Sequence, residues 1–138
     1  MVVGVQENSG AGVRLRGRAI AVGVAVLAAV VLWLIAVPVI GQELAVTYPE
    51  REPMTVGFGP VVVFAAGSSL AGWGLLALLE LVTRARARIV WTVIAAIVLV
   101  LSFSPLLQIE AAGSTKATLA LLHLVVGVPL IFGFWRTR

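Results

Sequence analysis

The sequence contains no cysteine and one histidine, and charged residues make up only 12% of its 138 residues. Without cysteine the chain has no disulfide, no thiolate metal ligand and no thiol for prenylation or palmitoylation. A lone histidine is a poor metal site, so we expect no metal and no cofactor. Soluble domains carry about 25% charged residues, and the low charge therefore argues against a soluble fold.

Hydrophobic residues are correspondingly abundant and make up 61% of the sequence. Such an excess in one domain of this length requires an apolar solvent. The formal net charge of +4 could indicate a nucleic-acid partner. The arginines, however, lie at the ends of apolar runs and not along one helix face, so we expect a lipid bilayer as the partner and no nucleic acid.

Four apolar runs are each long enough to cross a bilayer, whose ~30 Å core needs about 20 helical residues. In lipid the backbone must form helices or a closed barrel, and uninterrupted runs are unlike the alternating strands of a barrel. The first run is also longer than the apolar stretch of a signal peptide, about 7–15 residues. The sequence therefore predicts helices over 19–40, 60–82, 89–107 and 117–135, after a flexible cytoplasmic tail at 1–13.

The basic residues fall mainly on one side of these helices. Four crossings leave only Arg51 and Lys116 on one side and eight arginines on the other: Arg14, Arg16, Arg18, Arg84, Arg86, Arg88, Arg136 and Arg138. Because lysine and arginine collect in cytoplasmic loops, both termini are predicted to be cytoplasmic. Short connections favour antiparallel neighbours. Residues 14–138 are therefore predicted to form one all-α four-helix transmembrane bundle with up-down-up-down topology.

Polar side chains are rare within the runs, and several fall at a similar depth. His123 is the only ionisable residue deep in a run, roughly 5 Å to the outer side of the midplane at 1.5 Å per residue. The same arithmetic predicts an outer polar layer of Trp33, Ser68, Ser69, Ser102 and His123. Polar groups in lipid are often functional, so this layer is a candidate ligand or proton site. We favour a structural role, in which a neutral histidine bonds to serines of neighbouring helices.

Glu80 is a second candidate, at the cytoplasmic end of the second run. It precedes Arg84 by four residues, which is the favourable order for a helical ion pair. We expect a cytoplasmic rim ion pair between Glu80 and Arg84 that anchors the helix. The alternative is a carboxylate at the mouth of a cytoplasmic cavity.

The second run is rich in small residues, which let helix backbones approach closely. Gly67 and Ala71 are four residues apart, and so are Ser68 and Gly72. We expect this helix to be the central packing element of the bundle. The alternative is that these residues form a seam between copies of the chain.

Three segments of the second half form a moderately specific pattern: RIVWTVIA at 88–95, LVLS at 99–102 with Pro105-Leu106, and TLALLHLVVG at 118–127. The pattern resembles an uncharacterised family of small four-helix membrane proteins from actinobacteria. The resemblance covers residues 60–138 well and the first helix by position and character. Where that family often has methionine before the histidine, this chain has Leu122. The resemblance implies the four-helix fold and highlights Trp91, Thr92, Ser102 and His123, but it implies no activity.

An enzyme within the bilayer would need paired acids, a metal cluster or an activated nucleophile, and the sequence shows none. We therefore predict a bacterial plasma-membrane protein that is not an enzyme. It would act by packing with itself or with another membrane protein, and its small-ligand site would lie in the polar layer. The alternative is a small transporter or channel subunit that uses His123 and the adjacent serines.

Overall fold

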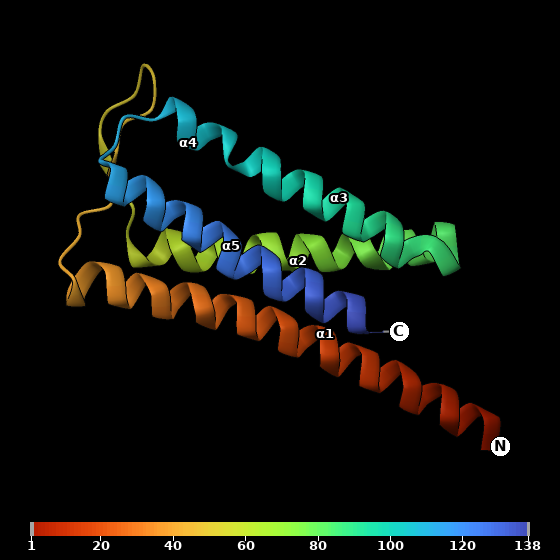
Figure 1. Cartoon of the computed structure of the whole chain (residues 1–138). Helices are drawn as coiled ribbons and strands as arrows, with labels where there is room; N and C mark the ends of the chain where they lie inside the picture. The colour runs from red at the N-terminus through yellow and green to blue at the C-terminus, as the bar shows by residue number, and fades with distance from the viewer. Residues whose placement is uncertain (1, 138) are drawn as a thin grey trace.

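The structure, a computed structural model, describes the backbone of residues 2–137 and the side chains of residues 10–137. The chain is mostly helical, and the long helices run side by side (Figure 1). In chain order the elements are α1 (Val2–Leu34), η1 (Ile35–Val39), β1 (Ala45–Val46), β2 (Met54–Thr55), α2 (Phe58–Thr83), η2 (Arg84–Arg86), α3 (Ala87–Ser102), α4 (Ser104–Gln108) and α5 (Gly113–Arg136).

The two ends of the molecule differ in composition. Figure 1 shows the start of α1, the end of α5 and the turn between α2 and α3 toward one end, with the loops at the other. We call the first the basic end, because it carries Arg14, Arg16, Arg18, Arg84, Arg86, Arg88 and Arg136. The second, which contains the β1–β2 hairpin, is the loop end.

Three helical stretches of the described chain are long and apolar enough to cross a membrane: Gly10–Val39, Phe58–Gln108 and Gly113–Arg136. The middle stretch contains α2, α3 and α4, and α3 runs back along α2 (Figure 1). Large apolar side chains cover the outside of the molecule; Phe64, Leu81 and Leu107 are 78%, 80% and 84% exposed. Apolar surface of this extent would promote aggregation in water but is compatible with lipid. The helices are therefore compatible, in length and in composition, with those of a membrane protein.

Proline, glycine and one strained arginine set the helix ends. At Pro38, which lacks an amide hydrogen, α1 widens into the π-helical turn η1, where Ile40 N–H donates to Ile35 O at 2.9 Å. Gly41 then stops the helix with a φ of +83°. At the opposite end Arg84, with a φ of +47°, terminates α2 and starts the return of the chain.

α1 begins earlier than the sequence predicts. Residues 2–13, expected to form a flexible tail, continue the helix, and α1 projects past the other helices at the basic end (Figure 1). The segment contains no proline, and extending an existing helix adds one hydrogen bond for each residue that is fixed.

α1, and not α2, is the central packing element. Its contacts with α5 and α2 are the two most extensive helix contacts in the described structure. Ala21, Ala25 and Ala29 recur every four residues on one face of α1, and all three are buried. A Cβ added to Gly133 on α5 would lie 2.5 Å from Ala21 Cβ. Small residues on both helices therefore let the two backbones approach closely.

The loop end is closed by a small sheet. Strands β1 and β2 pair antiparallel, and Thr47 exchanges two backbone hydrogen bonds with Glu110, of 3.0 and 2.9 Å. Leu44, Val46 and Ile109, within and next to these paired segments, are buried. The connection from α1 to α2 is thus joined to the segment just before α5, in a region outside the four predicted helices.

Candidate functional site

His123, the centre of the predicted polar layer, is satisfied by its own helix. Its Nδ1 lies 2.6 Å from Leu119 O, one turn earlier on α5. A carbonyl oxygen only accepts, so Nδ1 donates this bond and a neutral ring keeps Nε2 as an acceptor. The ring lies beside Phe103 at the end of α3, with ring centroids 5.7 Å apart. The neighbour that the structure gives to His123 is therefore an aromatic ring and not a serine.

The three serines of the layer also bond within their own helices. Ser68 donates to Phe64 O at 2.6 Å, Ser69 to Ala65 O at 2.5 Å and Ser102 to Leu99 O at 2.5 Å. Ser69 is completely buried, whereas Ser68 is exposed. Back-bonding of this kind satisfies a hydroxyl without linking two helices.

Trp33 is the member of the layer that links distant segments. Its Nε1 donates to Val56 O at 3.2 Å, just before α2, and its ring packs edge-on against Phe58. Trp33 thus fastens α1 to the start of α2 at the loop end. Within the part of the chain that the structure describes, no hydrogen bond joins two members of the polar layer, and a ligand role for them stays a prediction.

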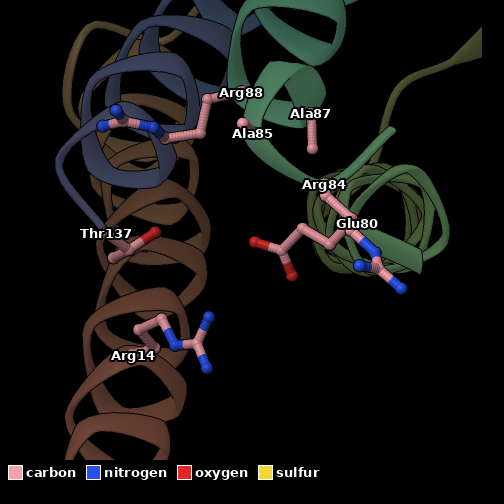
Figure 2. A pocket seen from close by; sticks show the side chains of 7 residues that line it. All are labelled: Arg14, Glu80, Arg84, Ala85, Ala87, Arg88 and Thr137. Atoms are coloured by element: carbon pink, nitrogen blue, oxygen red, sulfur yellow. The ribbon is translucent and has the colours of Figure 1, made fainter. Parts of the chain in front are cut away.

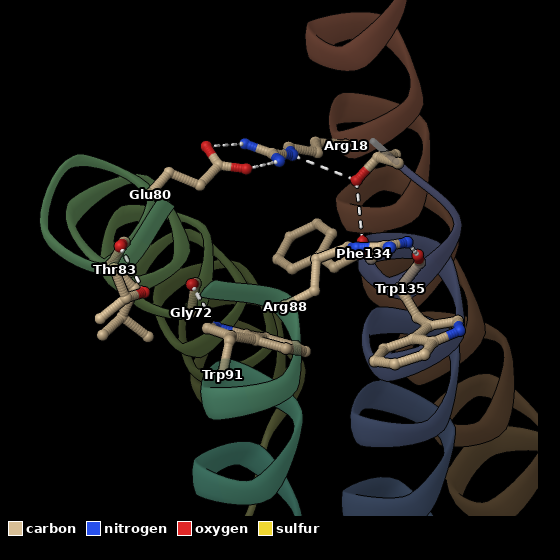
Figure 3. Close-up of polar contacts among 10 residues, drawn as sticks. Arg18, Gly72, Glu80, Thr83, Arg88, Trp91, Phe134 and Trp135 are labelled. Carbon is tan, nitrogen blue, oxygen red and sulfur yellow. Dashed lines mark hydrogen bonds and ion pairs between the residues drawn. The ribbon is translucent and has the colours of Figure 1, made fainter. Parts of the chain in front are cut away.

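Glu80 pairs with Arg18 of α1 and not with Arg84, the partner expected from helical spacing. Both carboxylate oxygens accept from the Arg18 guanidinium of α1: Nη1 donates to Oε2 at 3.0 Å, and Nη2 donates to Oε1 (Figure 3). The expected partner, Arg84, lies beyond the end of α2, where the helical geometry of an i,i+4 pair is lost. The two side chains leave the helix in different directions (Figure 2).

The Arg18 side chain lies between three helices. It is only 6% exposed, and the side chain of Glu80 is 30% exposed. Arg18 Nε donates to Thr137 Oγ1 at 3.2 Å, and that hydroxyl donates to Phe134 O at 2.9 Å (Figure 3). A two-point bond between guanidinium and carboxylate has a fixed geometry. It therefore sets how α1, α2 and the end of α5 meet at the basic end.

Two tryptophans complete this end of the fold. Trp91 of α3 is buried against Phe134 and donates from Nε1 to Gly72 O at 2.8 Å. Arg88 lies over the Trp135 ring, 5.0 Å from its centroid, and donates to Trp135 O at 2.7 Å. A cation over an indole face is attracted by the ring quadrupole. These contacts connect α3 to both α2 and α5 (Figure 3).

A depression of about 390 Å³ opens beside Glu80, and Figure 2 shows the side chains that line it. We call it the basic depression; it is lined by Arg14, Glu80, Arg84, Ala85, Ala87, Arg88 and Thr137. Its arginines come from α1, η2 and α3, three elements that only the tertiary fold brings together. Because Arg18 engages both oxygens of Glu80, positive charge dominates the lining.

The sequence did carry a signal for this site, although a weak one. Arg18 shares a helix face with Ala21 and Ala25, at spacings of three and seven residues. An arginine that continues a row of small buried residues is a candidate for a buried ion pair. Glu80 is the acidic residue that the apolar stretch Phe58–Gln108 contains, so the pair joins the two charges that most need a partner.

Comparison with protein families gives a match over nearly the whole chain. A family described as "Family of unknown function (DUF6069)" covers residues 9–138. The chain belongs to this family. The DUF6069 region extends from α1 to the end of α5 and so contains both the polar layer and the basic depression. The expectation of an uncharacterised family is thereby confirmed. No curated protein and no solved structure shows significant similarity to the chain.

Proposed function

We propose that the chain is a multi-pass protein of the bacterial plasma membrane that crosses the bilayer four times with both termini in the cytoplasm. Support comes from the course of the chain, because α2 and α3 run in opposite directions and each would form one crossing (Figure 1). The distribution of basic residues supports the orientation, since seven arginines lie at the basic end and Arg51 and Lys116 at the other.

We further propose that the protein is not an enzyme and acts by association of helices in the bilayer, with a second copy of the chain as the partner. The observation that carries this is the open face of α2. A Cβ added to Gly67 or to Gly74 would meet no atom within 4 Å, and Ala71 between them is exposed. These three residues, at spacings of four and three, lie on one side of the helix.

A small-residue face without an internal partner is what a second transmembrane helix requires. In lipid, helices associate through close backbone approach and not through the hydrophobic effect, so small residues mark the interfaces. Inside the fold this role belongs to Ala21 and Gly133, where α1 and α5 meet. The equivalent surface of α2, formed by Gly67, Ala71 and Gly74, is directed outward and remains available.

Disulfide cross-linking in native membranes tests this proposal, and the absence of cysteine from the chain makes every introduced thiol unique. We expect Ala71→Cys to give a covalent dimer on mild oxidation. The matched control is Val98→Cys on α3, which is 58% exposed. Both positions lie roughly 18–20 Å from the turn at η2, at 1.5 Å per residue, so the two thiols have a similar depth.

Association through α2 would be supported if Ala71→Cys formed more covalent dimer than Val98→Cys. The dimer of Ala71→Cys should also disappear when Gly67→Leu or Gly74→Leu is added. Equal cross-linking at both sites would indicate random collision and would contradict the proposal. So would the absence of any dimer in Ala71→Cys.

A further inference from the structure

The basic depression is a site that neither the polar layer nor the open face of α2 explains. We propose that it binds the phosphate group of an anionic phospholipid from the cytoplasmic leaflet. Three arginines from three elements, Arg14, Arg84 and Arg88, line a hollow of about 390 Å³ (Figure 2). The inference rests on the proposed orientation, which places the basic end at the cytoplasmic face.

The charge of the lining favours an anion. Glu80 is its one acidic residue, and both of its oxygens already accept from Arg18. The Arg88 guanidinium uses one N–H for Trp135 O and has five in total, so further donors remain for a ligand. Arg14 and Arg84 are exposed at the rim. One guanidinium group can donate two parallel hydrogen bonds to two phosphate oxygens, so its binding is directional as well as electrostatic.

The surroundings favour a lipid over a free phosphate. Leu81 and Val82 precede Arg84 on α2, and Ile89 follows Arg88 on α3; they are 80%, 74% and 57% exposed. These side chains do not line the depression, but a phosphate held by the arginines would lie within one helical turn of them, and acyl chains can pack against this exposed apolar surface of α2 and α3. Basic pockets between membrane helices at the cytoplasmic side are typical sites for anionic lipid headgroups.

The test uses the full chain, purified in an uncharged detergent, with bound lipid counted by native mass spectrometry. The probes are phosphatidylglycerol, phosphatidylcholine and inorganic phosphate. We expect the chain to retain phosphatidylglycerol in preference to phosphatidylcholine, and inorganic phosphate at millimolar concentration not to displace it. The double variant Arg14→Gln/Arg84→Gln should lower the apparent affinity for phosphatidylglycerol about tenfold or more, because two charge-assisted donors are lost.

The control variant is Arg16→Gln/Arg86→Gln. It removes the same charge from the same two elements, but neither residue lines the depression. Diffuse electrostatic attraction between lipid and protein falls equally in both double variants. A difference in phosphatidylglycerol affinity between them therefore requires a specific binding site at the basic depression. Equal loss in the two variants, or no preference for phosphatidylglycerol, would overturn the site. Displacement by inorganic phosphate would overturn the assignment to a lipid. Recovery of the chain in the soluble fraction before purification would instead contradict the membrane proposal.

Discussion

Arg18 and Glu80, 62 residues apart in the chain, form a two-point ion pair at the basic end. Removing one partner leaves the other charge in a largely buried position, which is more costly than replacing both by apolar residues. We expect Glu80→Gln to lower the free energy of unfolding by about 2–3 kcal/mol. The double variant Arg18→Met/Glu80→Met should lower it by less than the sum of the losses in Arg18→Met and in Glu80→Met. Denaturant titration in detergent measures both, and additive losses would show that the pair is not coupled.

Gly133 faces Ala21 at a distance that permits no side chain. We expect Gly133→Ala to reduce stability by about 1–3 kcal/mol, because the added methyl overlaps Ala21 Cβ and forces α1 and α5 apart. Gly23→Ala on α1 is the control, since a Cβ at Gly23 would meet no atom within 4 Å. Thermal unfolding should separate the two variants, and equal midpoints would argue against close contact of α1 and α5.

Gly72 is packed beneath the Trp91 ring. A Cβ added there would lie 3.5 Å from Trp91 Cζ2, so alanine fits but a leucine side chain would displace the indole that bonds to Gly72 O. Gly72→Leu should therefore lower the unfolding midpoint more than Ala77→Leu at an exposed position of the same helix. A normal near-ultraviolet circular dichroism signal in Gly72→Leu would show that Trp91 had not moved.

The proposed topology predicts the location of both chain ends. Fusions of a reporter that is active only outside the cytoplasm should be inactive at Met1 and at Arg138, and active when inserted in the loop at Glu50. A reporter that is active at Arg138 but inactive at Met1 would require an odd number of crossings. An active reporter at both termini would reverse the orientation.

His123 bonds to its own helix, and this changes the expected result of mutating it. A ring that held a serine of another helix would be replaced better by asparagine than by leucine. Since Nδ1 donates to Leu119 O, we expect His123→Leu to cost no more stability than His123→Asn. A markedly lower unfolding midpoint for the leucine variant would reveal a polar partner. Loss of a transport activity in both variants, with the fold intact, would favour the transporter alternative.

Local composition predicts some features of this fold and not others. Long apolar runs and terminal arginines predict membrane helices, because hydropathy and charge are properties of each segment alone. The Arg18–Glu80 pair depends on how α1 and α2 align in space, and no local pattern specifies that. The pattern around Glu80 suggested Arg84 as its partner, since helical spacing can be read from the sequence while the end of α2 at Arg84 cannot.

The polar layer illustrates the same difference. Depth calculated from helix rise places Ser69, Ser102 and His123 at one level, but depth does not say which way a side chain points. Each of the three bonds to a carbonyl of its own helix. The prediction that α2 is the central packing helix is wrong for a related reason: small residues occur on α1 and α2, and only the tertiary fold shows that Ala21, Ala25 and Ala29 are the buried set.

The arrangement of Arg18 has a consequence for biogenesis. The ribosome delivers α1 first, whereas Glu80 and Thr137 follow 62 and 119 residues later. At about 5–20 residues per second, several seconds pass between the synthesis of Arg18 and that of its partners Glu80 and Thr137. The Arg18 guanidinium is unpaired during this time. A chain interrupted before α5 would keep an incompletely satisfied arginine in its first helix.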